Sequence, residues 1–177
     1  MITAERNIIT RGLPKTGQSI EYQAGDDGTY QAGWWQRRLL ANNRQRFLSR
    51  VFAGDVVTID RATSLMWAAD GNEAGCNNGG WITWPNALIY AEGLIFAGFN
   101  DWRLPNIKEL FSIYDPSLAP SPVDPVFFPN TDYTSSYWSS TTVISNTAKA
   151  WQVITIGYVG FDSKTSTYPI RCVRGGI

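Results

Sequence analysis

The sequence predicts a single α+β domain built on an antiparallel sheet, with two flanking helices and long irregular loops. Runs typical of strands precede and follow two segments with helical spacing, an order that favours segregated strands and helices. The chain has 177 residues, enough for one domain with a sizeable core. Its many Gly, Pro and aromatic residues and its low content of charged residues (17%) indicate a loop-rich globular domain.

The N-terminal part of the chain is polar and rich in turn residues. We expect residues 1–50 to form an arm and an Arg/Trp-rich extension packed on the core, and residues 51–177 to form the domain itself. The loop at residues 25–28 offers two adjacent carboxylates, Asp26 and Asp27, but it lacks the alternating oxygen ligands of a calcium loop. No metal site is therefore predicted there.

Five arginines interrupt an apolar segment at residues 34–52. Arginines among aromatic residues could bind an anionic partner, such as a sulfated glycan or a nucleic acid. The alternative is a segment that packs its apolar side on the protein while its arginines are solvated or pair with nearby acids. We favour the second interpretation. The arginines are Arg37, Arg38, Arg44, Arg46 and Arg50.

Two short strands and then a helix are predicted in the next part of the chain. Residues 54–67 read as the strands, because β-branched residues and a short apolar run are separated by turn residues. A loop at residues 68–80 leads to a helix that is capped by Thr83, tolerates Pro85 in its first turn and ends at Gly98. Apolar residues of this helix recur at helical spacing, at Trp84, Leu88, Ala91 and Ile95.

A second helix is predicted at residues 104–114, with Asn106 as its cap. Its expected inward residues are Ile107, Leu110, Phe111 and Tyr114. A long irregular loop follows at residues 115–136, and long loops in compact domains often carry function. The remaining strands are expected at residues 137–140, 150–156, 158–161 and 170–173.

The composition excludes several kinds of chemistry. Histidine is absent, which removes Ser-His-Asp triads and the usual zinc and non-haem iron sites, and two cysteines cannot build a four-cysteine zinc site. We therefore expect no metal and no cofactor. Fifteen basic and fifteen acidic residues cancel, which argues against nucleic acid as a partner. No apolar run is long enough to insert into a membrane, and the start of the chain lacks the apolar region of a signal peptide.

Four blocks of the sequence, in order, are similar to the Lcl C-terminal domain family, a prokaryotic domain of unknown function. The blocks are TSLMW at 63–67, WPNALIYAEGL with AGFNDWRLPNIKEL within 84–110, YWSST at 137–141, and AWQV with IRCVRGG within 150–176. The lead-in at residues 13–28 resembles the stretch that often precedes the core in this family. The Arg-rich segment 34–52 departs from the family pattern and is not mapped onto it.

The resemblance implies a C-type lectin-like fold, in which the termini meet in one sheet, two helices flank it, and long loops and late strands expose a binding face. Arg103 is then expected to pair with Glu109 or with the backbone, and Arg171 and Arg174 are expected to be held in the same way. The matching blocks place seven residues in the core or at its edge: Trp67, Trp84, Trp102, Leu104, Leu110, Trp138 and Trp151.

The same resemblance bears on the two cysteines. A lectin-like fold often bridges its last strand to the loop before the first helix, so Cys76 and Cys172 could form a disulfide. In a reducing compartment the two thiols would stay free.

The resemblance also implies a function: a non-catalytic ligand-binding module, receptor-like or adhesin-like, for a protein or glycan on another cell or surface. Related lectin-like groups include variable proteins of diversity-generating retroelements, whose adenine-containing codons near the C-terminus are randomised. Residues 154–167 are drawn from the residue types that this process yields, except for Lys164.

The expected contact residues mix aromatic and small polar side chains, as antibody binding surfaces do. They are Val143, Ile144, Ser145, Asn146, Ile154, Ile156, Tyr158, Phe161, Asp162, Ser163, Thr165 and Thr167. The alternative for Ile154, Ile156 and Phe161 is that they continue the core face of the sheet by alternation.

Two other functions remain as alternatives. A formylglycine-generating-type oxidase shares the fold and an Arg-Cys ending, but such oxidases use a pair of nearby active-site cysteines, and only Cys76 and Cys172 exist here. The chain could also be a structural subunit at the tip of a surface fibre or virion. Calcium-dependent sugar binding needs a Glu/Gln-Pro-Asn/Asp tripeptide in the long loop, where this chain has VDPVFFPN at 123–130. A cell-surface, secreted or virion location fits these readings better than the cytoplasm.

Overall fold

The computed structural model describes residues 15–16, 18–31, 35–36, 39–40, 45–115, 118, 121–154 and 157–175. Its elements, in chain order, are α1 (Asp27–Tyr30), β1 (Trp35–Gln36), β2 (Leu39–Leu40), β3 (Phe47–Phe52), β4 (Asp55–Asp60), β5 (Leu65–Ala68), a 3-10 segment (Ala74–Gly79), β6 (Ile82–Thr83), α2 (Trp84–Glu92), α3 (Ile107–Ser112), β7 (Ser136–Thr142), β8 (Lys149–Ile154), β9 (Tyr158–Ser163), β10 (Thr167–Tyr168) and β11 (Val173–Arg174). All strand pairs are antiparallel. The predicted α+β class is confirmed.

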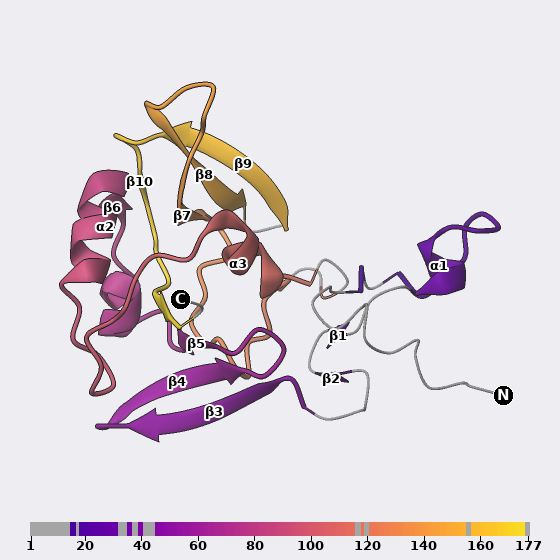
Figure 1. The fold of residues 1–177 in the computed structure, drawn as a ribbon, viewed down its shortest axis with the longest axis horizontal. Helices are drawn as coiled ribbons and strands as arrows, with labels where there is room; N and C mark the ends of the chain where they lie inside the picture. Colours follow the sequence, from indigo (N-terminus) through magenta and orange to yellow (C-terminus); the bar gives the residue numbers. More distant parts are fainter. Residues whose placement is uncertain are drawn as a thin grey trace, which may run out of the picture.

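Two sheets organise the domain (Figure 1). The first has the strand order β11-β5-β4-β3, so a late strand pairs with an early one, with Val173 opposite Trp67. The second has the order β7-β8-β9, and a short β10–β6 pair lies beside α2. The β3–β4 hairpin closes through Ala53 and Gly54, both with positive φ, the backbone that a two-residue turn between twisted strands requires.

The first long helix is shorter than the sequence predicts. α2 follows Thr83, as predicted, but it ends at Glu92 rather than near Gly98. Gly98 instead lies in a tight turn, where Phe96 and Phe99 exchange backbone hydrogen bonds. Asp55 accepts a hydrogen bond from the Ala97 N–H at 2.8 Å and so fixes this turn. Tertiary contacts therefore end the helix early and leave Ile95 exposed.

The second helix confirms its predicted cap. The side chain of Asn106 accepts from the backbone N–H groups of Lys108 and Glu109, and the Glu109 carboxylate accepts from the N–H of Asn106. This reciprocal capping box satisfies donors that the first turn would otherwise leave unpaired. Leu110 is buried as predicted, whereas Phe111 is exposed, because the helix is only six residues long and turns a single narrow face inward.

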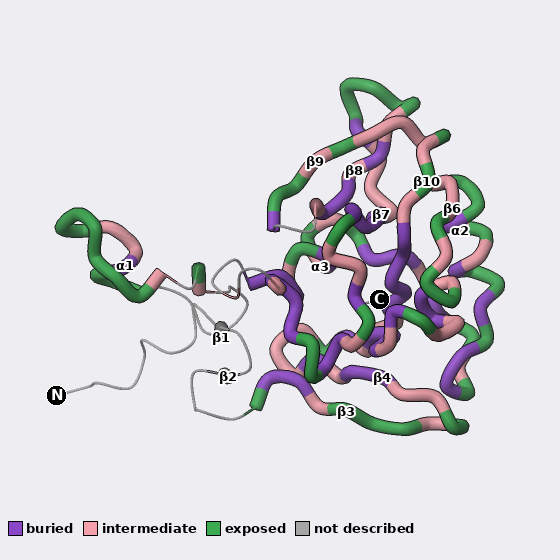
Figure 2. Tube along the Cα trace, turned by 180° about the vertical axis from the view of Figure 1, so that it is seen from behind, coloured by how far each residue is buried: buried purple, intermediate pink, exposed green. Residues whose placement is uncertain are grey.

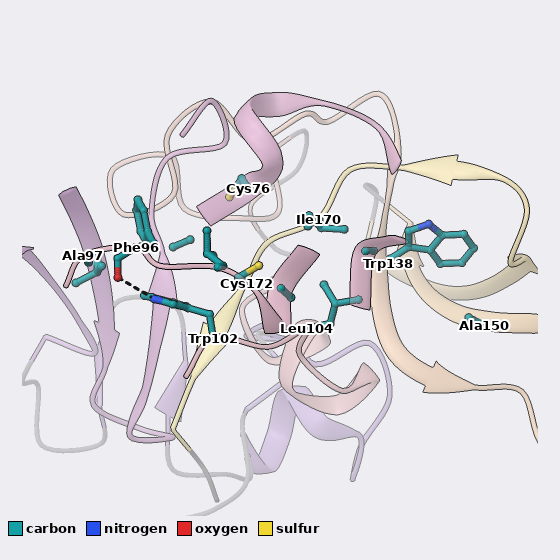
Figure 3. Packing of buried hydrophobic residues seen from close by; sticks show 14 residues of the cluster. Cys76, Phe96, Ala97, Trp102, Leu104, Trp138, Ala150, Ile170 and Cys172 are labelled. Atoms are coloured by element: carbon teal, nitrogen blue, oxygen red, sulfur yellow. Dashed lines mark hydrogen bonds between the residues drawn. The ribbon is translucent and has the colours of Figure 1, made fainter. Parts of the chain in front are cut away.

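Two clusters of buried apolar residues fill the interior (Figures 2 and 3). One gathers Trp102, Leu104 and Trp138 around both cysteines, and Figure 3 shows the Trp102 indole donating to the Phe96 carbonyl. The other packs β5 and β8 against α3 and the long loop. Five of the seven predicted scaffold residues are buried: Trp67, Trp102, Leu104, Leu110 and Trp138. The other two, Trp84 at the start of α2 and Trp151 on the central strand β8, are half-buried, in keeping with a place at the edge of the core.

Charged residues near the core are paired, as predicted for three of them. Arg103 holds Glu109 through two hydrogen bonds of 2.8 Å. Arg174 likewise donates two hydrogen bonds to the carboxylate of Asp101. Arg171 is 1% exposed and donates to the carbonyls of Ala68 and Ala69 and to the hydroxyl of Thr131.

The Arg-rich segment contributes one buried arginine. Arg46 is 2% exposed and holds Asp60 through two hydrogen bonds, which agrees with the interpretation of local pairing. Arg50 is exposed, and among the described residues it donates to the Ser49 carbonyl. The predictions for Arg37, Arg38 and Arg44 lie outside the described residues.

The expected boundary between the N-terminal arm and the domain falls inside a strand. β3 crosses the expected boundary between residues 50 and 51, and its first residue, Phe47, is buried in the core. Upstream, Figure 1 shows α1 set apart from both sheets, and Ile20, Tyr22 and Tyr30 around it are exposed. The Asp26 carboxylate caps α1 by accepting from the backbone of Gly28 and Thr29, a structural role for the predicted acidic loop.

Candidate functional site

The predicted contact residues between β7 and β8 form one tight, exposed turn. The N–H of Val143 donates to the Lys149 carbonyl, and the N–H of Asn146 donates to the Val143 carbonyl. These bonds fix the turn, so that Ile144 is 96% exposed and Ser145 and Asn146 are also exposed. Val143 itself is 5% exposed, contrary to the prediction, because it starts the turn with its side chain packed inward.

A second predicted group, in the turn between β9 and β10, lies against the first. The N–H of Lys164 donates to the Ala148 carbonyl, and Ser163 is directly opposite Lys149 in the sheet. Ser163 is half-buried, and Thr165 and Thr167 are exposed. The structure therefore brings two of the three predicted segments together at one end of the β7-β8-β9 sheet.

The third predicted group lies at the other end of that sheet. Ile154 and Tyr158 are opposite each other where β8 meets β9, five residues along β9 from Ser163, or roughly 17 Å away at the usual rise of a strand. Tyr158 is 64% exposed and Ile154 is half-buried. Ile156 lies outside the described residues. The predicted set is therefore divided between two locations.

The remaining predicted contacts, Phe161 and Asp162, point to opposite faces of β9, because successive strand residues alternate. Phe161 is 48% exposed, contacts Trp151 edge-on and lies under the ammonium of Lys149, 4.9 Å from its ring centre. Phe161 is therefore a partly exposed residue that is held against Trp151 and Lys149. The Asp162 side chain faces β10, and the Tyr168 hydroxyl of that strand donates a 2.7 Å hydrogen bond to the Asp162 carboxylate.

Tyr168, the hydrogen-bond partner of Asp162, forms an aromatic pair with Trp81, and neither residue was predicted as a contact from the sequence. Trp81 is 54% exposed, and its ring stacks on Tyr168 with the centroids 6.3 Å apart. We call Trp81, Asp162 and Tyr168 the Trp81 surface. A weak signal for it was present, since Trp81 follows the NNGG turn and Tyr168 precedes Pro169, which places both aromatics at strand ends beside turn residues.

The carboxylate of the Trp81 surface is ionised and oriented. The hydroxyl of Tyr168 and the backbone N–H of Ser163 hold the pKa of Asp162 below its ordinary value. The same hydrogen bond raises the pKa of Tyr168, because losing the phenol proton would place two negative charges together. At neutral pH this surface therefore offers one fixed negative charge next to two aromatic rings.

Lys164 ties the β9–β10 turn to the rest of the domain. Its ammonium lies 3.9 Å from the centre of the Trp84 ring and donates to the Thr142 hydroxyl at 2.9 Å. Its carbonyl accepts from the Trp84 N–H, and the Trp84 indole donates to the Ser139 carbonyl. These bonds connect β7, α2 and the turn, so Lys164 has a structural role rather than a role in ligand contact.

Replacing Lys164 with methionine is expected to lower the free energy of unfolding by about 1 kcal/mol, because the cation–π contact and one hydrogen bond are lost while most of the aliphatic stem is kept. Denaturant unfolding followed by tryptophan fluorescence measures this change. Thr165→Ala, in the same turn but exposed, serves as the control and should leave stability unchanged. Equal stability of the two variants would contradict the role given to Lys164.

The two cysteines are free and buried side by side in the core. The N–H of Cys172 donates to the carbonyl of Gly75, next to Cys76. Burial raises the pKa of both thiols, so both are protonated at neutral pH. The disulfide is not formed in this structure, and the pairing stays a prediction.

Neither a metal centre nor a membrane-spanning helix is found in the part of the chain that the structure describes. Within it, no group of three or more His, Cys, Asp or Glu side chains converges in a way that could hold a metal ion. None of its helices is long and apolar enough to cross a bilayer.

Sequence comparison agrees with the blocks identified above. The family model of the Lcl C-terminal domain matches residues 56–174, which run from the second residue of β4 to the end of β11 and contain both turns of the candidate site. No curated protein matches the chain. Because the family model covers more than half of the 177 residues, the chain belongs to the Lcl C-terminal domain family.

Proposed function

We propose that this chain is a non-catalytic ligand-binding module with a C-type lectin-like fold. Three features support the fold. The late strand β11 completes the sheet of the early strands β3–β5, two helices flank the sheets, and a long irregular segment precedes β7. The second sheet then projects its turns away from the first, as Figure 1 shows for β7, β8 and β9.

The exposed β7–β8 turn, held by backbone hydrogen bonds, is the observation that carries the binding function. Ile144 is almost fully exposed on a turn whose conformation depends on Val143, Asn146 and Lys149 backbone groups. An apolar side chain so presented loses little conformational freedom on binding, and it gains free energy when a partner covers it. Ser145 and Asn146 add polar groups that can adapt to different partners.

Residues that hold the core together are separate from the exposed residues of the two turns, which fits a receptor whose contact residues vary. The side chains of Arg103, Arg171 and Arg174 bond within the protein, whereas the exposed side chains of the two turns contribute little to the core. Substitution of the exposed turn residues would therefore leave the fold intact. We propose diversification by a retroelement on this basis, and a near-identical DNA repeat that differs only at adenines, beside a reverse transcriptase gene, would identify it.

The buried thiols favour binding over oxidation chemistry. A reactive cysteine needs a lowered pKa and access to its substrate. Cys76 and Cys172 are each about 1% exposed or less, and burial raises the pKa of both. The oxidase alternative therefore lacks a nucleophile at the surface.

Binding is tested with arrayed glycans and purified cell-surface proteins as probes for the full chain. We expect at least one probe to bind, and Ile144→Ser combined with Asn146→Ala to weaken that binding by about tenfold or more. Val51→Ser, at an equally apolar exposed position on β3 of the other sheet, is the matched control and should bind normally. EDTA should leave the affinity unchanged, since no calcium site is predicted.

Three outcomes would count against the proposal. If no probe binds, or if the turn variant binds as well as the wild-type chain, the β7–β8 turn is not a binding surface. Loss of binding in EDTA would show that a cation takes part in ligand recognition.

A further inference from the structure

We propose that the Trp81 surface is a subsite for a neutral pyranose ring, an inference that rests on the proposed binding function and names its ligand class. The ring of Trp81 would stack on the apolar C–H face of the sugar, and Asp162 would accept hydrogen bonds from its hydroxyl groups. Three observations support this assignment.

The first is that Trp81 is both exposed and held in place. Tyr168 stacks on it with an interplanar angle of 24°, and Tyr168 in turn contacts the buried Trp138 edge-on, with centroids 4.9 Å apart. The chain from Trp138 through Tyr168 to Trp81 therefore anchors an exposed indole on the core. A ring fixed in this way loses little side-chain entropy when a ligand stacks on it.

The second observation concerns the indole N–H groups. Trp84, Trp102 and Trp138 donate theirs to the backbone carbonyls of other residues, and the unpaired N–H of Trp67 is buried and out of reach of a ligand. The Trp81 N–H has no acceptor among the described residues. It is available to a ligand, and a sugar hydroxyl or ring oxygen can accept it.

The third observation is the fixed carboxylate. One oxygen of Asp162 accepts from the Tyr168 hydroxyl and the other from the Ser163 N–H, at 2.7 and 2.6 Å. A carboxylate oxygen can accept more than one hydrogen bond, so both oxygens keep acceptor capacity for ligand hydroxyls. Tyr168 bonds to Asp162 and stacks on Trp81, so the carboxylate and the indole are held in place before a ligand binds.

The local charges favour a neutral sugar over a sulfated one. The lysines on the neighbouring strand and turn are both engaged: Lys149 lies over Phe161, and Lys164 lies over Trp84 and bonds to Thr142. The charge that the Trp81 surface itself presents is the negative one of Asp162. A sulfate or carboxylate placed there would be repelled, whereas an uncharged ring with hydroxyl groups would not.

The test uses ¹⁵N–¹H spectra of the full chain titrated with methyl β-D-glucopyranoside, methyl β-D-galactopyranoside and methyl α-D-mannopyranoside through the millimolar range. The Trp81 indole signal is identified by its disappearance in Trp81→Phe. We expect at least one sugar to shift this signal while the signals of Trp84, Trp102 and Trp138 stay in place. A sulfated heparin disaccharide should not shift it.

Variants then measure how much Trp81 and Asp162 each contribute to sugar binding. Trp81→Ala should weaken binding by about tenfold or more, Trp81→Phe should retain part of it, and Asp162→Asn should weaken it severalfold. Tyr30→Ala is the matched control, because it removes an exposed aromatic on α1, apart from both sheets, and should not change sugar binding. Thermal unfolding confirms that each variant is folded.

Absence of any shift with the three sugars, or equal sugar binding by Trp81→Ala, would overturn the sugar subsite. Binding of only the sulfated disaccharide would do the same. These results are distinguishable from failure of the proposed function, because the array experiment reads out the β7–β8 turn through Ile144 and Asn146, and Trp81 is not changed there.

Discussion

Replacing Asp60 with alanine is expected to lower the free energy of unfolding by about 3–5 kcal/mol, because it leaves the buried Arg46 without its carboxylate. Asp60 is fully buried and accepts four hydrogen bonds: two from Arg46, one from the Ala62 N–H and one from the Thr63 hydroxyl. Arg46 also donates to the Ser112 carbonyl at the end of α3. The pair therefore joins the β3–β4 hairpin to a helix.

Thermal and urea unfolding measure this loss, which corresponds to a fall in Tm of roughly 10 °C for a chain of this size. Asp101→Ala is the matched control. Asp101 holds Arg174 with similar two-pronged geometry, but it is half-exposed, so water replaces the lost bonds and the cost should stay below about 1 kcal/mol. Equal effects of the two substitutions would refute the argument from burial.

The second large effect is expected at Arg171. Replacing it with methionine should lower the free energy of unfolding by about 3 kcal/mol or more, since the carbonyls of Ala68 and Ala69 and the hydroxyl of Thr131 stay buried and lose their donor. A matching apolar side chain does not help, because the acceptors are left behind. The guanidinium also lies over the Phe128 ring, 5.3 Å from its centre.

Arg171→Lys should recover only part of this stability, because a single ammonium cannot reach all three acceptors with the geometry of the guanidinium. Arg174→Met is the control at a half-exposed position of the same strand region and should cost much less. Urea unfolding of the three variants gives the comparison. If Arg171→Met is as stable as the wild-type chain, the buried hydrogen bonds are not important for the fold.

Local patterns were enough to predict much of this fold. Asn106 and Glu109 form a capping box within one turn, and the nearby Arg103 pairs with Glu109, so short-range sequence signals were correct there. The Arg46–Asp60 pair was not predicted as such. It depends on the register of the β3–β4 hairpin, and β3 begins inside a segment whose arginines obscure its strand pattern.

The candidate site was predictable only in part, for a similar reason. The exposed turn residues Ile144 to Asn146 follow a strand that matches the family pattern, so their place could be inferred. Trp81 and Tyr168 meet through the β6–β10 pair, which has only two residues in each strand. Two residues are too few for alternation to be recognised, and the segments are far apart in the sequence. Only the folded chain brings these two aromatics together.

The pairing of β11 with β5 has a consequence for folding during protein synthesis. Arg174 and Met66 lie opposite each other although 108 residues separate them, and the Val173 backbone also exchanges hydrogen bonds with Arg103. Such distant contacts make folding slow relative to helical proteins of similar stability. The first sheet cannot close until residues 173–174 have left the ribosome. Until then the nascent chain exposes the unpaired edge of β5, where a chaperone or a second nascent chain can bind.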